Sequence, residues 1–101
     1  MHLIQLLLPI VQTGEESTSS SLQALREELI ERFGGVTAYT RSPARGAWLE
    51  TGDHVVHDDV IIVEVMSDTL DREWWRTLRV RLEQQLDQES IVIRASNISM
   101  L

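Results

Sequence analysis

The stretch Asp58-Asp59-Val60-Ile61-Ile62-Val63-Glu64-Val65-Met66 decides the fold. Branched aliphatic residues fill residues 60–65 with one charge among them, so we interpret residues 58–66 as the central strand of a small sheet. Successive side chains of a strand point to opposite faces. One face therefore carries Ile61, Val63 and Val65, and the other carries Val60, Ile62, Glu64 and Met66. A strand that is apolar on both faces needs a cover on both.

Composition limits the kinds of partner. The chain has 101 residues and a formal net charge of -7, with nine cationic residues. We expect one domain spanning residues 1–101 that does not bind nucleic acid, because such binding rests on clustered positive charge. The absence of cysteine excludes disulfides, thiolate metal sites and a cysteine nucleophile, and it fits a cytoplasmic protein. No segment approaches the roughly 20 apolar residues of a membrane span.

Three further segments have the alternation of strands. Residues 2–11 predict the first strand, and residues 36–41 predict the second, followed by a turn or bulge at 42–46 and a resumption at 47–49. Residues 90–95 predict the last strand. The sheet should therefore have four strands.

Two segments have the spacing of amphipathic helices. Leucines recur at helical spacing up to Phe33, and Gly34 and Gly35 should end this helix. Ser20 and Gln23 have the spacing of a capping box at its start. The second helix should be capped by Asp68 or Ser67 and end within residues 84–88. Its expected buried stripe comprises Trp74, Trp75, Leu78, Leu82 and Leu86.

The order β-α-β-β-α-β predicts a ferredoxin-like α+β sandwich. In this arrangement an antiparallel sheet of order 4-1-3-2 carries both helices on one face. The other face, which we call the open face, would remain uncovered in a single chain. Since large exposed apolar patches mark interfaces, we expect a homodimer formed through the open face.

Each strand adds polar side chains to this apolar face. The candidates are Gln5, Tyr39, Arg41, Glu64 and Arg94. In one interpretation, Glu64 is a general base or hydrogen-bond acceptor with Tyr39 as donor, while Arg94, Gln5 and Arg41 bind a small polar or anionic ligand. In the other, Glu64 and Arg94 form a structural ion pair, within one chain or across the dimer.

A possible metal cluster near the central strand has unsuitable geometry. His54 and His57 would fall on opposite faces of an extended hairpin, and so would Asp58 and Asp59. Because the ligands of one ion must converge, we expect no metal site here, and we expect no cofactor.

Several segments together resemble a group of small uncharacterised bacterial proteins. They are Phe33-Gly34-Gly35-Val36-Thr37-Ala38-Tyr39, Arg41-Ser42-Pro43-Ala44-Arg45-Gly46-Ala47-Trp48, Glu64-Val65-Met66 and Asp71-Arg72-Glu73-Trp74-Trp75. That group implies no activity. At the level of fold, the chain is also similar to the dimeric α+β barrel superfamily, in which two ferredoxin-like sheets pack face to face. Its haem-degrading branch is disfavoured, because the iron there is held by a helical histidine and neither expected helix contains one.

Three functions remain open from the sequence. The leading expectation is an uncharacterised homodimer that binds a small polar or anionic ligand on the open face. The resemblance to dimeric α+β barrels implies an alternative, a cofactor-free isomerase or monooxygenase that uses Glu64 and Tyr39. The third is a protein-interaction or regulatory module.

Overall fold

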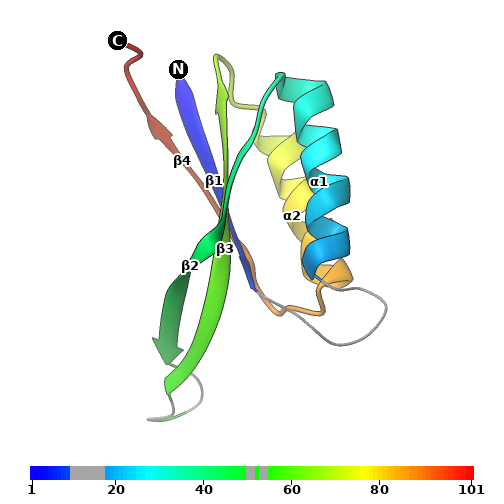
Figure 1. Cartoon of the computed structure of the whole chain (residues 1–101), viewed down its shortest axis with the longest axis vertical. Helices are drawn as coiled ribbons and strands as arrows, with labels where there is room; N and C mark the ends of the chain where they lie inside the picture. Colours follow the sequence, from blue (N-terminus) through cyan, green and yellow to red (C-terminus); the bar gives the residue numbers. More distant parts are fainter. Residues whose placement is uncertain (10–17, 50–51, 53–54) are drawn as a thin grey trace.

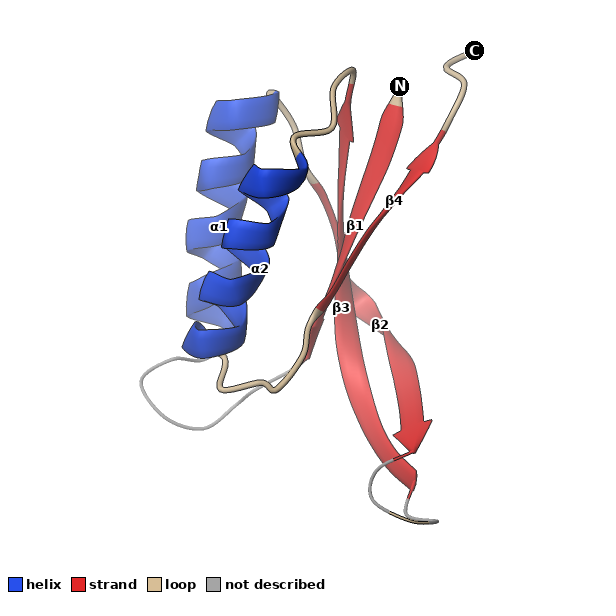
Figure 2. Cartoon of the chain, turned by 180° about the vertical axis from the view of Figure 1, so that it is seen from behind, coloured by secondary structure: helices blue, strands red, loops and turns tan. Residues whose placement is uncertain are grey.

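Six elements make up the fold in the computed structural model, which describes residues 1–9, 18–49, 52 and 55–101. They are β1 (His2–Pro9), α1 (Thr18–Phe33), β2 (Thr37–Leu49), β3 (Val55–Ser67), α2 (Arg72–Gln85) and β4 (Val92–Asn97). The strands form one antiparallel sheet of order β2-β3-β1-β4, and both helices lie on one face of it (Figure 1). The view from behind in Figure 2 shows the same two layers. The predicted ferredoxin-like α+β fold is confirmed.

The second and third strands are longer than the sequence indicated. β2 runs without interruption from Thr37 to Leu49, and β3 already begins at Val55. The register shifts between Tyr39 and Ala44, which overlaps the turn or bulge predicted at residues 42–46 only at its start, since Ala44, Arg45 and Gly46 pair regularly with β3. Beyond this shift the two strands continue as a twisted hairpin arm that extends past the helices (Figure 1). Along this length each strand hydrogen-bonds to the other through one edge of its backbone. This pairing explains why the residues typical of turns did not end β2.

The core lies between the sheet and the helices. The residues of β3 that face it are Ile61, Val63 and Val65, as predicted. The other buried residues are Ile4, Leu6, Leu8, Leu22, Leu25, Leu29, Trp75, Leu78, Leu82, Leu86 and Ile91. Burial of each such side chain contributes about 1.5–3 kcal/mol relative to exposure. Within the described residues, no helix is both long and apolar enough to cross a membrane.

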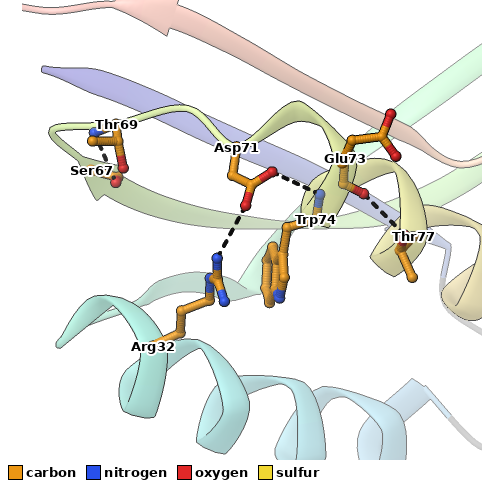
Figure 3. A network of polar contacts seen from close by, with 7 residues as sticks. All are labelled: Arg32, Ser67, Thr69, Asp71, Glu73, Trp74 and Thr77. Carbon is orange, nitrogen blue, oxygen red and sulfur yellow. Dashed lines mark hydrogen bonds and ion pairs between the residues drawn. The ribbon is translucent and has the colours of Figure 1, made fainter.

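Both predicted helix starts are wrong. α1 begins at Thr18, so Ser20 and Gln23 lie inside the helix and not at its predicted start. α2 is capped by Asp71, whose Oδ1 accepts the backbone N–H of Trp74 at 3.1 Å (Figure 3). The Oγ of Ser67 instead accepts the N–H of Thr69 at 3.3 Å. Ser67 therefore stabilises a local turn after β3, and the helix cap lies farther along the chain at Asp71.

The helix ends follow backbone chemistry more closely. Gly34 has a φ of 83° and donates its N–H to the carbonyl of Ile30 at 2.8 Å, which confirms the predicted end of α1. α2 ends at Gln85 with Leu86 as its C-cap residue, and the next residue, Asp87, has a φ of 50°. Aspartate is one of the few residues besides glycine that adopts this conformation, so α2 ends without a glycine.

An aromatic cluster joins the C-terminal end of α1 to the N-terminal end of α2. The ring of Phe33 stacks on Trp75 with centroids 5.2 Å apart, and Trp74 packs edge-on against both rings. The guanidinium of Arg32 lies 4.4 Å from the Trp74 centroid, and its Nη2 lies 3.4 Å from Oδ2 of Asp71 (Figure 3). Both tryptophans therefore serve helix packing.

Candidate functional site

A row of polar side chains crosses the open face from one sheet edge to the other. In the strand register, Thr37 pairs with Glu64, Glu64 pairs with Gln5, and Gln5 pairs with Arg94. Directly paired residues in an antiparallel sheet project from the same face. These four residues, which we call the polar row, therefore lie side by side on the face opposite the helices.

Hydrogen bonds connect three members of the polar row with a tyrosine. Arg94 donates from Nε to Oε1 of Gln5 at 2.9 Å, and Gln5 donates from Nε2 to Oε1 of Glu64 at 2.8 Å. Tyr39, which pairs with Ile62 in the neighbouring row, donates its hydroxyl to Oε2 of Glu64 at 3.2 Å. Both oxygens of the carboxylate thus have a donor, and the amide of Gln5 is held at both ends. This continuous chain spans all four strands.

Glu64 and Arg94 do not contact each other within the chain. They belong to strands on opposite sides of β1, so their backbones lie about 10 Å apart at the usual strand spacing. Gln5 occupies the space between them and bonds to both. The sequence interpretation of a direct ion pair within one chain is therefore replaced by an amide-bridged arrangement. An ion pair across a dimer stays a prediction.

The carboxylate of Glu64 sets the chemistry of the tyrosine beside it. Its negative charge, and second the hydrogen bond from the hydroxyl, raise the pKa of Tyr39 above the ordinary value of 10.0. Both effects act in the same direction, because a phenolate would face the carboxylate and lose the proton that it donates. Tyr39 is therefore a hydrogen-bond donor at neutral pH.

Apolar residues flank the polar row on both sides. Leu3 pairs with Met66 on one side, and Leu7 pairs with Ile62 on the other. Met66 retains 51% of its accessible surface, Val92 49% and Tyr39 47%. Neither α1 nor α2 covers this side of the sheet in Figures 1 and 2. The open face thus combines a hydrogen-bonded polar centre with an apolar surround.

Other residues singled out from the sequence lie partly outside the described residues. Arg41 belongs to β2, but its side chain is outside them, as are His54 and the side chains of His57 and Asp58. Among the described residues, no group of three histidine, aspartate or glutamate side chains could hold a metal ion.

Sequence reasoning identified four of the joined residues but missed how they are joined. Alternation placed Gln5, Tyr39, Glu64 and Arg94 on one face, and the structure brings them together. The bridging position of Gln5 depends on the register of β1 against both neighbours. The equal apolar patterning of the strands gave no signal for that register.

Comparison with known proteins identifies the fold alone. No protein-family model matches the sequence, and no curated protein matches it. The structure is similar to a phage SAM lyase in complex with S-methyl-5′-thioadenosine, with a TM-score of 0.61 and 13% identity over 94% of this chain and 79% of that one. The apo state of a phage SAM lyase matches with a TM-score of 0.55 and 13% identity, over 94% and 78% of the two chains. The resemblance to small bacterial proteins stays a prediction.

Proposed function

We propose that this chain forms a homodimer through its open face and binds a small polar or anionic molecule beside the polar row. The observation that carries the proposal is the hydrogen-bonded chain from Arg94 through Gln5 to Glu64 and Tyr39. Side chains held in this way lose little further freedom when a ligand binds, so their polar groups favour binding. A similar fold occurs with S-methyl-5′-thioadenosine bound, which supports a small molecule as the ligand.

Arg94 and Glu64, two members of the hydrogen-bonded row, suit a ligand that carries both an anionic group and a hydrogen-bond donor. Arg94 uses Nε for Gln5, which leaves the two terminal nitrogens of its exposed side chain for a carboxylate or phosphate. Glu64 is half-buried and accepts hydrogen bonds, so it favours a hydroxyl or amino group of the ligand. The apolar surround would contact the remainder of the molecule.

A second copy of the chain is the proposed cover of the open face. In a face-to-face pair with a twofold axis parallel to the strands, each polar row lies over the reversed row of the partner. Gln5 would then face Glu64 of the partner subunit, and the positive end of one row would approach the carboxylate half of the other. This self-complementarity is what an isologous interface requires.

A cofactor-free enzyme is the second candidate function. The 3.2 Å contact between the Tyr39 hydroxyl and Oε2 of Glu64 favours it, because it pairs a proton donor with a carboxylate base. In such an isomerase or monooxygenase, Glu64 would remove a proton from the substrate. Tyr39 would donate a hydrogen bond to the oxygen on which negative charge develops.

Calorimetric titration with two related probes tests ligand binding. S-methyl-5′-thioadenosine is polar without a carboxylate, whereas SAM carries one. We expect saturable binding of both, with SAM tighter because Arg94 holds its carboxylate. Arg94→Gln should abolish that preference, and Glu64→Gln should weaken both probes by about tenfold.

Ser96→Ala is the matched control, since Ser96 pairs with Leu3 on the open face outside the polar row. It should change neither affinity. If neither probe binds the unmodified protein, or if Glu64→Gln and Arg94→Gln bind as the control does, the ligand proposal is wrong. The open face is then better explained as a surface for another protein.

A further inference from the structure

A second polar region lies on the helical side of the sheet, between α2 and β4. It is a hollow of about 180 Å³. The lining comprises three arginines of α2, five apolar residues and Arg94 of β4, whose guanidinium hydrogen-bonds to Gln5 on the open face: Arg72, Arg76, Arg79, Ile4, Leu70, Trp75, Ile93, Ala95 and Arg94. No acidic residue among the described residues lines it. In a chain with a net charge of -7, such a one-sided concentration of positive charge is notable. We call this region the arginine groove.

The helix geometry accounts for the clustering. Arg72, Arg76 and Arg79 stand at positions i, i+4 and i+7 of α2, which lie on one side of a helix. Trp75 shares that side and is buried. Ile93 and Ala95 of β4, the edge strand, and Ile4 of β1 form the sheet side of the groove. The groove thus lies between α2 and the two strands at that edge of the sheet.

Acidic neighbours neutralise these arginines only weakly. Arg76 lies 3.7 Å from Glu73, with both side chains largely exposed, and Arg79 lies 4.0 Å from Glu83. Oε2 of Glu83 also accepts the backbone N–H of Ile91 at 2.8 Å, so that oxygen is shared. Exposed pairs at such distances contribute little stability. Arg72 forms no ion pair with another described residue.

We propose that the arginine groove binds the oxyanion headgroup, phosphate or carboxylate, of a small molecule. Guanidinium groups bind both headgroups through two parallel hydrogen bonds. The volume suits a headgroup with a small substituent, because pockets for complete drug-sized ligands begin near 300 Å³. The partly exposed Leu70 and Ile93 supply apolar surface for that substituent, with the buried Trp75 beneath them.

The edge of the sheet adds further donors. Among the described strands, β4 pairs only with β1, so the outer edge of β4 presents backbone N–H groups next to the groove. An anion held by the arginines would lie near this edge. The described lining residues include no competing carboxylate.

The inference does not rest on the function proposed for the open face. Only Arg94 takes part in both regions, and Arg72 and Arg76 lie on the helical side of the sheet. Substitutions at Arg72 and Arg76 therefore test the groove without altering the polar row.

Titrations with small anions, followed by calorimetry, test the groove. The probes are phenyl phosphate, benzoate and inorganic phosphate, each added to the full chain at low salt. We expect saturable binding of phenyl phosphate or benzoate, tighter than inorganic phosphate because of the apolar wall. The tighter of the two aromatic probes identifies the headgroup. Raising the salt concentration should weaken binding.

The decisive comparison is between two double variants with equal change in charge. Arg72→Gln with Arg76→Gln should reduce affinity by about tenfold or more, since each removes a charged donor. Arg26→Gln with Arg81→Gln changes α1 and the far side of α2 and should leave affinity within about twofold. Circular dichroism confirms that both variants fold.

Three results would overturn the proposal. The first is the absence of saturable binding for all three probes. The second is an equal loss in both double variants, which indicates a general charge effect. The third is tighter, groove-dependent binding of a peptide of alternating glutamate and valine, which would show that the groove receives an added acidic strand at β4.

Discussion

Tyr39 reports directly on the polar row, because it is the only tyrosine of the chain. The charge of Glu64, together with the hydrogen bond to it, raises the pKa of Tyr39. We predict that Glu64→Gln leaves the fold intact and returns the pKa of Tyr39 toward its ordinary value, since the amide carries no charge. The near-ultraviolet absorbance of tyrosinate, followed against pH, measures this directly. An unchanged titration in the variant would contradict the predicted contact.

The same shift predicts a pH dependence of stability. The folded-state pKa of Tyr39 is raised above that of the unfolded chain, so folding favours the protonated hydroxyl. This contribution is fully present below the unfolded pKa of 10.0 and is lost as pH rises through the folded-state pKa. Urea unfolding of the unmodified protein should therefore lose stability in that alkaline window. Glu64→Gln should lose less there, and an identical decline would contradict the linkage.

Gly34 and Gly35 form a matched pair at the end of α1. Gly34 has a φ of 83°, whereas Gly35 has no positive φ, and a Cβ at either position meets no atom within 4 Å. Gly34→Ala should therefore destabilise the fold by about 1 kcal/mol through backbone strain alone. Gly35→Ala should be neutral or stabilising by about 0.5 kcal/mol, because it restricts the unfolded chain. Equal unfolding midpoints in urea would show that Gly34 does not need its left-handed conformation.

At the level of single elements, the sequence prediction and the structure differ in which residue caps the start of α2. Asp71 caps the helix through Trp74, whereas Asp68 lies before it with no capping bond among the described residues. Asp71→Ala should cost about 1 kcal/mol, because it leaves a helix N–H without its acceptor and removes the contact with Arg32. Asp68→Ala should change stability by less than about 0.5 kcal/mol. If Asp68→Ala destabilised the protein more than Asp71→Ala in thermal or urea unfolding, Asp68 would be the cap, as the sequence predicted.

The misplaced helix starts show what local sequence determines and what it leaves open. Several side chains that precede Trp74 are able to cap the N-terminus of α2, and composition alone does not choose among them. They are Ser67, Asp68, Thr69 and Asp71. The choice depends on where β3 ends and how far the chain must travel to place Trp75 and Leu78 on the sheet. The end of α1 was better determined, because Gly34 specifies a backbone conformation directly.

Over the whole molecule, the order of the elements predicted the sheet order, and the alternation of β3 predicted the uncovered face. Ile61, Val63 and Val65 are buried against the helices, whereas Met66 on the other face is half-exposed. The sequence predicted that the second strand resumes at residues 47–49, but not one continuous arm, because Pro43 and Gly46 in β2 are typical of turns. The arginine groove was also missed. Arg72, Arg76 and Arg79 looked like an ordinary solvated helix side, and only the packing of α2 beside β4 turns them toward a shared hollow.

The uncovered face makes a prediction about assembly. Ile62 lies near the middle of the open face, between Leu7 and Tyr39 in the register, so a proposed dimer would bury it. Ile62→Asp would place a carboxylate without a partner in that interface, at a cost of several kcal/mol. We expect this variant to sediment as a monomer or to aggregate. Val80→Asp is the control, because Val80 is an exposed apolar residue of α2 on the helical side and should leave the dimer intact. A dimer that survives Ile62→Asp, or a monomeric unmodified protein, would remove the open face as the interface.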